Sequence, residues 1–421
     1  MNKLFGNFAI YVLVFLSTGA ISGIYTGEEA LKSGTATASS NATLQLAYGS
    51  LYLLLILLML PQFRALLPLL FREKWMSLLI LLAVASTLWS IEPSDTFRRS
   101  LGLLGTTLAG LYIGTHVEPK RQVRIVAFCV GVAAVLSLIA GLTVPHVAIS
   151  PDGWQGVFFQ KNTLGRIMSL GIVAMAFIAV GQRRYRIAAI ATIPLCALLL
   201  LLSGSVTAAA ITIALLVGIL LVPVLRWPAS RLIAFGVAVT ALAIPTVLWV
   251  FQNADSVLRA LGKETHLTGR LPLWALVRAE IATMPILGHG YAAFWSTAES
   301  DRFRQALNWD VMNAHNGFLE MMLGLGVVGL IIFVIGLIRN IYLGFVVARA
   351  GDTLDQAWPL FFLAFALLWD VTDSALFAGN SIMWLLYTTN AFWLVSTAAE
   401  LRAEKRARYA PANQEPEFAS T

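Results

Sequence analysis

The residue best suited to catalysis in this sequence is a histidine that precedes a long apolar run. His315 is followed by Asn316 and then by a stretch that would form a helix. The positive end of a helix disfavours a protonated imidazole, so we expect His315 to be largely neutral near pH 7. A neutral imidazole accepts a proton from a hydroxyl as general base. The alternative is a capping or packing histidine.

Two other apolar runs begin with basic residues. Arg98 and Arg99 precede one of them, and Lys161 and Arg166 begin another, where Asn162 would cap the helix. A cation at a helix N-terminus is unfavourable by a few tenths to about 1 kcal/mol, so its repetition suggests a common purpose. Helix N-termini with added cations form anion sites, and phosphate is the usual occupant. The alternative is that these side chains reach the phosphates of lipid headgroups.

The long polar segment between two apolar runs, residues 252–312, adds further candidates. Arg270 and Arg278 lie eight residues apart on a predicted helix, with Trp274 between them. His289 lies in a glycine-rich turn and would line a site. A loop of this length is functional or disordered, and its aromatic content argues against disorder.

Acidic candidates are few. Asp370 and Asp373 lie one turn apart near the end of the predicted helix 356–376. A carboxylate in such a place is a functional hypothesis, and a structural partner for one of the arginines is the alternative. Cys129 and Cys196 each lie within an apolar run, without the Cys and His spacing of a metal site. We therefore expect neither a metal ion nor a cofactor.

The composition indicates the kind of fold that holds these residues in place. Of the 421 residues, 58% are hydrophobic and 12% charged, against roughly a quarter charged in soluble domains. A membrane-spanning helix needs about 20 mostly apolar residues. The sequence predicts an all-α polytopic membrane protein with about twelve transmembrane helices, at residues 6–24, 43–60, 75–90, 99–117, 123–144, 162–181, 187–203, 205–225, 232–251, 313–338, 356–376 and 381–398.

Lysine and arginine fall mostly on one side of this arrangement. The positive-inside tendency then places both termini in the cytoplasm and His315 at the periplasmic face of a bacterial inner membrane. The predicted parts are nine helices in residues 1–251, a periplasmic loop with short helices in 252–312, three helices in 313–398 and a cytoplasmic tail in 399–421. The basic tail would contact anionic lipid. The net charge of +7 needs no nucleic acid as a partner.

The run after His315 also resembles a known family motif. His315-Asn316 is followed by nine residues, Gly326, two more residues and Gly329. This is similar to the H-[NSQ]-x9-G-x-x-[GTY] pattern of the O-antigen ligase family, which is related to Wzy-type polysaccharide polymerases. The small glycines would also let this helix pack closely.

Other segments extend the resemblance. Residues 268–274 resemble the T-G-R-x3-W element of the family, and residues 285–290 resemble its P-x-x-G-x-G turn. Residues 156–165 are similar to the G-x-F-x-x-K-N-x-L-G segment of exopolysaccharide polymerase members. One departure is Ser203-Gly204-Ser205, where many members carry Ser-Arg-Ser.

The resemblance implies a metal-independent glycosyltransferase whose donor is a glycan on undecaprenyl diphosphate. It implies catalytic roles for His315 and Arg270. The cations at helix starts would bind the diphosphate and the remaining polar residues would support the site, namely Lys161, Arg98, Arg99, Arg166 and Arg278 for the first group and Asn162, Asn316, His289, Asp370 and Asp373 for the second. Attack by a hydroxyl opposite the leaving diphosphate would invert the anomeric centre.

Three functions remain open at this point. A polymerase would extend one lipid-linked glycan with another, and the Lys161-Asn162 segment favours it. A ligase would transfer the glycan to lipid A core, and either enzyme could work with polysaccharide export and chain-length proteins. A transporter of lipid-linked glycans would instead require charges at mid-membrane and repeated helix pairs.

Overall fold

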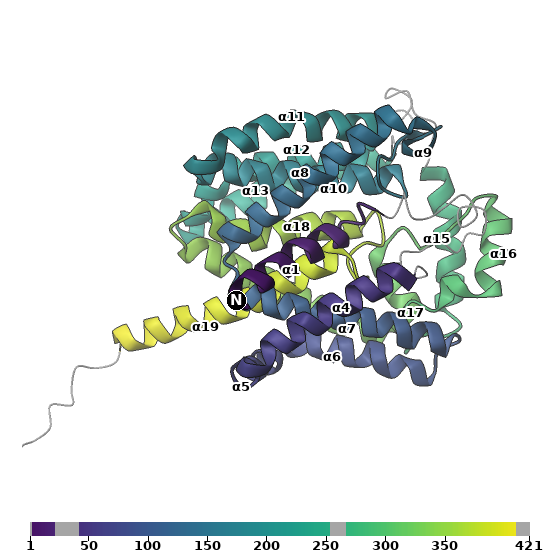
Figure 1. Cartoon of the computed structure of the whole chain (residues 1–421), viewed down its shortest axis with the longest axis horizontal. Helices are drawn as coiled ribbons and strands as arrows, with labels where there is room; N and C mark the ends of the chain where they lie inside the picture. The colour runs from purple at the N-terminus through teal and green to yellow at the C-terminus, as the bar shows by residue number, and fades with distance from the viewer. Residues whose placement is uncertain (1, 22–41, 253–266, 410–421) are drawn as a thin grey trace, which may run out of the picture.

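The structure is a computed structural model that describes residues 2–21, 42–252 and 267–409 (Figure 1). In these ranges the chain is almost wholly helical, with one antiparallel pair of two-residue strands, β1 (Ile149–Ser150) and β2 (Gly153–Trp154). The α-helices are α1 (Asn2–Ser17), α4 (Ala42–Met59), α5 (Phe63–Arg72), α6 (Lys74–Ala85), α7 (Pro93–His116), α8 (Pro119–Thr143), α9 (Pro145–Ala148), α10 (Lys161–Gly181), α11 (Arg186–Leu202), α12 (Val206–Leu220), α13 (Ala229–Gln252), α15 (Leu267–Ile281), α16 (Ala298–Leu307), α17 (Gly317–Ala350), α18 (Trp358–Asp370) and α19 (Ile382–Tyr409).

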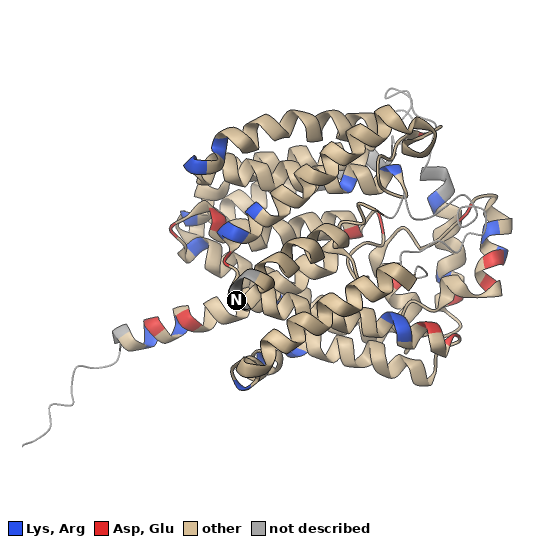
Figure 2. Cartoon of the chain, viewed as in Figure 1, with Lys and Arg blue, Asp and Glu red and all other residues tan. Residues whose placement is uncertain are grey.

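The helical membrane class predicted from composition is confirmed, and each of the twelve predicted spans contains a helix. Charged side chains gather at the two ends of the bundle and leave its middle mostly uncharged (Figure 2). In the described part of the chain, five helical segments are long and apolar enough to cross a bilayer, namely Ala42–Arg72, Pro119–Thr143, Lys161–Gly181, Arg183–Leu202 and Gly317–Ala350. Shorter apolar helices accompany them. The number of spans and the side of the membrane stay predictions.

Small residues allow the central helices to pack closely. A Cβ at Gly110 of α7 would lie 1.9 Å from the hydroxyl of Thr388 on α19. One turn further on, a Cβ at Gly114 would lie 2.5 Å from the carbonyl oxygen of Thr389. Helices in lipid associate largely through such close backbone approach. The glycines of α7 therefore hold this helix, which carries Arg98 and Arg99, against α19.

Residues 267–316, between α13 and α17, are well structured, as the aromatic content of this segment predicts. Its helices α15 and α16 lie together at one end of the molecule (Figure 1). They share a small apolar core that is separate from the main one, made by Leu273, Val277, Ile281, Phe294, Phe303, Val311, Ala314 and Leu323. The predicted amphipathic piece at residues 255–261 lies outside the described residues.

Helix α17 differs from its prediction at both ends and in the middle. It begins at Gly317 and not at residue 313, because His315 has a positive φ of 47° and Asn316 is the N-cap. It continues to Ala350, well past the predicted end at residue 338. Its backbone leaves the helical conformation at Gly326, where φ is 62°.

The glycine turn, residues 285–290, packs against this break in α17. The amide of Gly290 donates to the carbonyl of Gly324 at 2.9 Å, and the amide of Val327 donates to the carbonyl of Pro285 at 2.9 Å. A Cβ at Gly326 would lie 2.2 Å from the carbonyl oxygen of Ile286. The glycine turn and the histidine motif thus form one unit, in which Gly326 leaves room for the backbone of residue 286.

The last helix also outruns its prediction. Helix α19 is continuous to Tyr409, so residues 399–409 of the predicted tail are helical. This extension leaves the bundle at the end where the N-terminus lies (Figure 1) and carries charges of both signs (Figure 2). A helix that is polar all round after its apolar part extends into solvent.

Candidate active site

His315 lies in the turn that connects the loop after α16 to α17. Its amide donates to the side-chain oxygen of Asn313 at 2.8 Å. The side chain of Asn316 then accepts hydrogen bonds from the amides of Phe318 and Leu319, both at 3.1 Å. This is ordinary N-capping, in which a side-chain oxygen satisfies free amides of the first turn. The cap and the positive φ turn the imidazole away from the helix axis.

Three neighbouring elements hold this turn in place. From the segment after α18, Ser374 accepts a hydrogen bond from the amide of Asn316 at 3.1 Å. From α15, the indole of Trp274 donates to the carbonyl of Ala314 at 2.9 Å. From α17 itself, Glu320 accepts from the amide of Ala314 at 2.8 Å. The position of His315 therefore depends on contacts between segments far apart in sequence.

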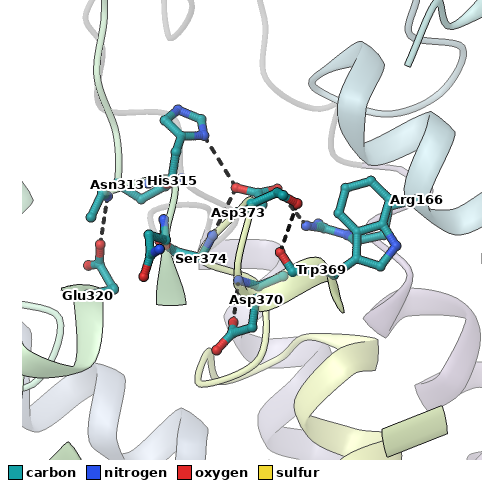
Figure 3. Close-up of polar contacts among 12 residues, drawn as sticks. Arg166, Asn313, His315, Glu320, Trp369, Asp370, Asp373 and Ser374 are labelled. Carbon is teal, nitrogen blue, oxygen red and sulfur yellow. Dashed lines mark hydrogen bonds and ion pairs between the residues drawn. The ribbon is translucent and has the colours of Figure 1, made fainter. Parts of the chain in front are cut away.

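Asp373 pairs with both a histidine and an arginine. Its Oδ1 lies 3.4 Å from Nδ1 of His315, and its Oδ2 accepts a hydrogen bond from Arg166 at 2.9 Å (Figure 3). Burial alone would raise the pKa of Asp373, but His315 and Arg166 outweigh it and hold the pKa at about 2. Asp373 is therefore an ionised carboxylate at neutral pH, and the arginine partner considered from the sequence is Arg166.

Arg270 on α15 lies within electrostatic range of the same carboxylate. Burial lowers the pKa of Arg270, and the charge of Asp373 acts in the opposite direction. The structure thus brings Arg166 of α10 and His315, before α17, together at one acidic side chain, with Arg270 of α15 in its electrostatic range. The guanidinium of Arg166 also lies over the ring of Trp369, 5.8 Å from its centroid.

A cavity of about 1040 Å³ lies beside this cluster. Arg98, Arg99, Arg166 and Asp370 are among the residues that line it. The Nε atoms of Arg99 and Arg166 are buried and have no hydrogen-bond partner among the described residues. Buried donors need acceptors. These two donors would suit an anionic ligand.

The two arginines of α7, Arg98 and Arg99, differ in how many protein groups already bind their side chains. Arg98 pairs with Asp95 at 2.8 Å and its side chain is partly exposed. Arg99 lies 3.3 Å from the same carboxylate and donates to the carbonyl of Ala292 and, at 2.8 Å, to the hydroxyl of Ser296. Arg99 therefore fixes the loop before α16 against α7, in addition to facing the cavity.

Several predicted site residues lie away from the cavity. Lys161 donates to the carbonyl of Asp152 at 3.0 Å, and Arg278 is exposed on α15. Neither lines the cavity, so their contacts with a diphosphate stay predictions. The predicted cap at Asn162 is wrong, because α10 begins at Lys161 and the preceding residue is its N-cap.

Two other predicted residues have structural contacts. His289 is buried, and its Nε2 lies 3.3 Å from a carboxylate oxygen of Glu280 on α15. Asp370 is also buried, and it accepts hydrogen bonds from the amides of Ala375 and Leu376 at 3.3 and 3.1 Å. Asp370 thus closes the turn that carries Asp373. His289 fastens the glycine turn to α15.

Glu320 is a cavity residue that the sequence analysis did not predict. It lies one turn into α17, lines the cavity, and accepts from the indole of Trp295 and the amide of Ala314, both at 2.8 Å. An acidic residue four positions after Asn316 in a strongly apolar run was the available signal. Arg304 and Asp95 also line the cavity and were not predicted. Within the described ranges, no three His, Cys, Asp or Glu side chains are grouped as metal ligands.

Comparison with known proteins finds a similarity to one family. Residues 189–334 match the family model described as O-antigen ligase. This part of the chain is therefore similar to the O-antigen ligase family. The chain is also 26% identical over 388 residues to the exopolysaccharide production protein ExoQ of Rhizobium meliloti (strain 1021). The aligned region covers 88% of this chain and 87% of that protein.

The O-antigen ligase match contains only part of the site. It runs from α11 to the middle of α17, so it includes Arg270 and His315. Arg99, Arg166 and Asp373 come from helices and loops outside the matched residues. The candidate site is therefore assembled from both halves of the chain.

Proposed function

We propose that the protein is a membrane glycosyltransferase whose donor is a glycan on undecaprenyl diphosphate. It would act at the periplasmic face of the inner membrane, without a metal ion and with inversion of the anomeric centre. The observation that supports this most directly is the pairing of His315 with Asp373 beside a cavity lined by arginines. The similarity of residues 189–334 to the O-antigen ligase family supports glycan polymerisation or ligation.

His315 would act as the general base. Its Nδ1 faces Asp373, which leaves Nε2 to accept the proton of the acceptor hydroxyl. A buried carboxylate on the far side of an imidazole fixes its tautomer and stabilises the imidazolium that forms. The acceptor oxygen would then attack the anomeric carbon as the bond to the diphosphate oxygen breaks. The helix start alone favours a neutral His315. Asp373 adds a carboxylate that stabilises the imidazolium formed when His315 accepts the proton.

The arginines would stabilise the leaving diphosphate. Negative charge develops on its bridging oxygen as the sugar bond breaks, and preorganised donors in a site of low dielectric stabilise that charge. Arg99 and Arg166 offer buried donors without partners among the described residues. Arg99 and Arg166 are the diphosphate contacts that the geometry favours most, with Arg98 at the exposed edge. Arg270 does not line the cavity and is proposed because it lies within electrostatic range of Asp373.

A polymerase is the form of this activity that we favour. The similarity to an exopolysaccharide production protein over most of both chains supports it. A polymerase would use a second lipid-linked glycan as acceptor, whereas a ligase would use lipid A core. Export and chain-length proteins are the partners expected of either enzyme.

Purified protein with a lipid-linked repeat unit as sole substrate tests this proposal. We expect a ladder of longer lipid-linked glycans without any added acceptor. A product that appears only when lipid A core is supplied would show a ligase. If neither condition yields a glycan product from protein that is folded and monodisperse, the glycosyltransferase proposal fails.

A further inference from the structure

An exposed tryptophan lies against the proposed base. The ring centroids of Trp309 and His315 are 5.5 Å apart, and the two ring planes are tilted by 33°. Although it makes this contact, Trp309 is 36% exposed, and the mechanism proposed above gives it no role. Substrate pockets are lined by aromatic side chains together with a few polar groups. An exposed aromatic ring beside the reacting nitrogen is therefore a candidate contact for substrate.

The loop that carries Trp309 is fixed on both sides of the ring. Asn308 ends α16 in the left-handed conformation, with a φ of 54°. Arg304 of α16 donates to the carbonyl of Val311 at 3.2 Å and pairs with Asp310 at 3.1 Å. Val311 is fully buried in the small core shared by α15 and α16. The loop thus presents Trp309 at a defined position, as a binding platform requires.

The indole N–H distinguishes Trp309 from two other tryptophans of this segment. Trp274 donates to the carbonyl of Ala314 at 2.9 Å, and Trp295 donates to Glu320 at 2.8 Å. Those two indoles stabilise the fold. The N–H of Trp309 has no hydrogen-bond partner among the described residues. An exposed apolar ring with a free donor at its edge suits a ligand that has both an apolar face and hydroxyl groups.

A sugar ring is such a ligand. One face of a pyranose carries C–H groups that pack on an aromatic ring, and its hydroxyl groups form hydrogen bonds around the edge. The second ring nitrogen of His315, Nε2, points away from Asp373 (Figure 3). Unlike Nδ1 it is not buried, and no described residue forms a hydrogen bond with it. A hydroxyl of a sugar that rests on Trp309 would therefore find an accessible acceptor beside it.

The position of Trp309 favours the acceptor sugar over the donor. In an inverting transfer, the acceptor oxygen and the leaving diphosphate lie on opposite sides of the anomeric carbon. Arg99 and Arg166 line the cavity that would bind the diphosphate, whereas Trp309 contacts the base and does not line this cavity. Trp309 thus lies where the group that gives its proton to His315 has to lie.

We propose that Trp309 is a stacking platform for the terminal sugar of the acceptor glycan and that it determines which sugars are extended. The inference rests on the proposed function, because it takes His315 as the base. Asn313 of the same loop would contact a hydroxyl where acceptor and donor meet. It lines the cavity, and its Oδ1 accepts from the amide of His315 at 2.8 Å, while its Nδ2 has no partner among the described residues.

Kinetics with an acceptor that cannot act as donor test the proposal. The lipid-linked repeat unit is the donor, and the same repeat unit released from its lipid diphosphate by mild acid is the acceptor. Trp309→Ala should raise the KM for the free oligosaccharide roughly tenfold, the scale of one aromatic contact, and leave the KM for the donor unchanged. Trp309→Phe keeps a ring and should stay within about threefold of wild type. Trp227→Ala, which removes another exposed tryptophan, is the control.

The other outcomes of these kinetics contradict the proposal. A fall in kcat with both KM values unchanged would show that Trp309 only packs against His315. Equal increases in the two KM values would show that its effect is not specific to the acceptor. If folded wild-type protein extends neither the free oligosaccharide nor a lipid-linked one, the proposed function itself fails.

Oxidative footprinting of wild-type protein in nanodiscs tests the contact without turnover. Hydroxyl radicals oxidise exposed tryptophans, and Trp227, which is 41% exposed, is an internal reference. The free oligosaccharide should protect Trp309 at least about threefold relative to Trp227, and inorganic diphosphate should not. Oxidation of Trp309 that the oligosaccharide leaves unchanged would overturn the inference, even in a protein that transfers glycan.

Discussion

At the scale of single residues, Asp373 organises the site. It pairs with Arg166 and His315, and its charge also acts on Arg270. These neighbours overcome the effect of burial and keep its pKa at about 2. Removing the charge while keeping the shape is therefore the informative change. It would leave two arginines near the histidine without their counter-charge.

Asp373→Asn should reduce glycan transfer by roughly 10²- to 10⁴-fold, the range that general acid–base catalysis contributes. The physical reason is that the imidazole loses both its orientation and the stabilisation of its protonated form. The measurement is single-turnover transfer from a lipid-linked glycan, with Asp152→Asn on the strand turn as control. Transfer at the wild-type rate in Asp373→Asn would contradict the assignment.

The same carboxylate makes stability depend on pH. Its pKa falls from an ordinary 3.8 to about 2 on folding, so its contribution is present above pH 4 and is lost as the pH falls through about 2. The shift corresponds to about 2 kcal/mol. The difference in melting temperature between wild type and Asp373→Asn should therefore shrink as the pH is lowered from 5 to 2. A difference that grows on acidification would have the wrong sign.

At the scale of elements, the break in α17 joins two motifs. The glycine turn before α16 pairs with the backbone on both sides of Gly326. Glu320 lies between this break and the start of the helix and ties Trp295 and Ala314 together. The first turns of α17 are thus a platform whose geometry sets the direction of His315.

Gly326→Ala should destabilise the protein strongly. An alanine would adopt a positive φ, at about 1–2 kcal/mol, and its Cβ would meet the carbonyl oxygen of Ile286 at 2.2 Å. Gly236→Ala meets nothing within 4 Å and serves as control. The melting temperature in detergent should fall for the first variant only. Equal melting temperatures would mean that the turn does not dock as described.

Glu320→Ala should lower kcat more than it changes KM. The variant frees the amide of Ala314 and the indole of Trp295, so the histidine turn shifts, and a displacement of about 1 Å can cost roughly 10²-fold. Glu320→Gln keeps one acceptor oxygen and should restore part of the rate. If alanine and glutamine variants behave alike, Glu320 acts through its charge and not through position.

Hydropathy could predict the helices, because each long apolar run must fold as a helix in lipid. The tertiary contacts of the site could not be predicted in the same way. His315 and Asp373 are 58 residues apart, and they meet only because a left-handed turn and the bend after α18 face each other. Lys161 and Arg166 share one helix start, yet only the second lines the cavity. Which face of a helix points inward depends on packing that a single pattern of charges does not specify.

At the scale of the whole molecule, the proposed function requires one orientation of the protein in the membrane. The ends of the bundle carry the charged residues (Figure 2), and the excess of cations in the segments near the termini predicts that the His315 end is periplasmic. Arg302 on α16 is 76% exposed at that end, and Glu404 on α19 is exposed at the other. The two native cysteines are buried. Labelling of single introduced cysteines can therefore report the orientation.

In intact cells, a membrane-impermeant maleimide should label Arg302→Cys and leave Glu404→Cys unlabelled. After the cells are opened, both should react. The native protein is the background control. Labelling of Glu404→Cys alone in intact cells would place the site in the cytoplasm and remove the lipid-linked glycan as its substrate.

The most direct measurement compares glycan transfer by wild type, His315→Ala and Arg270→Ala in nanodiscs, with a lipid-linked repeat unit as donor and acceptor. Two exposed residues supply matched controls, His146→Ala on α9 and Arg302→Ala on α16. We predict that the first two variants lose transfer by at least about 10²-fold and that both controls retain it. Wild-type polymer length and rate in folded His315→Ala protein would contradict the central role given to this histidine.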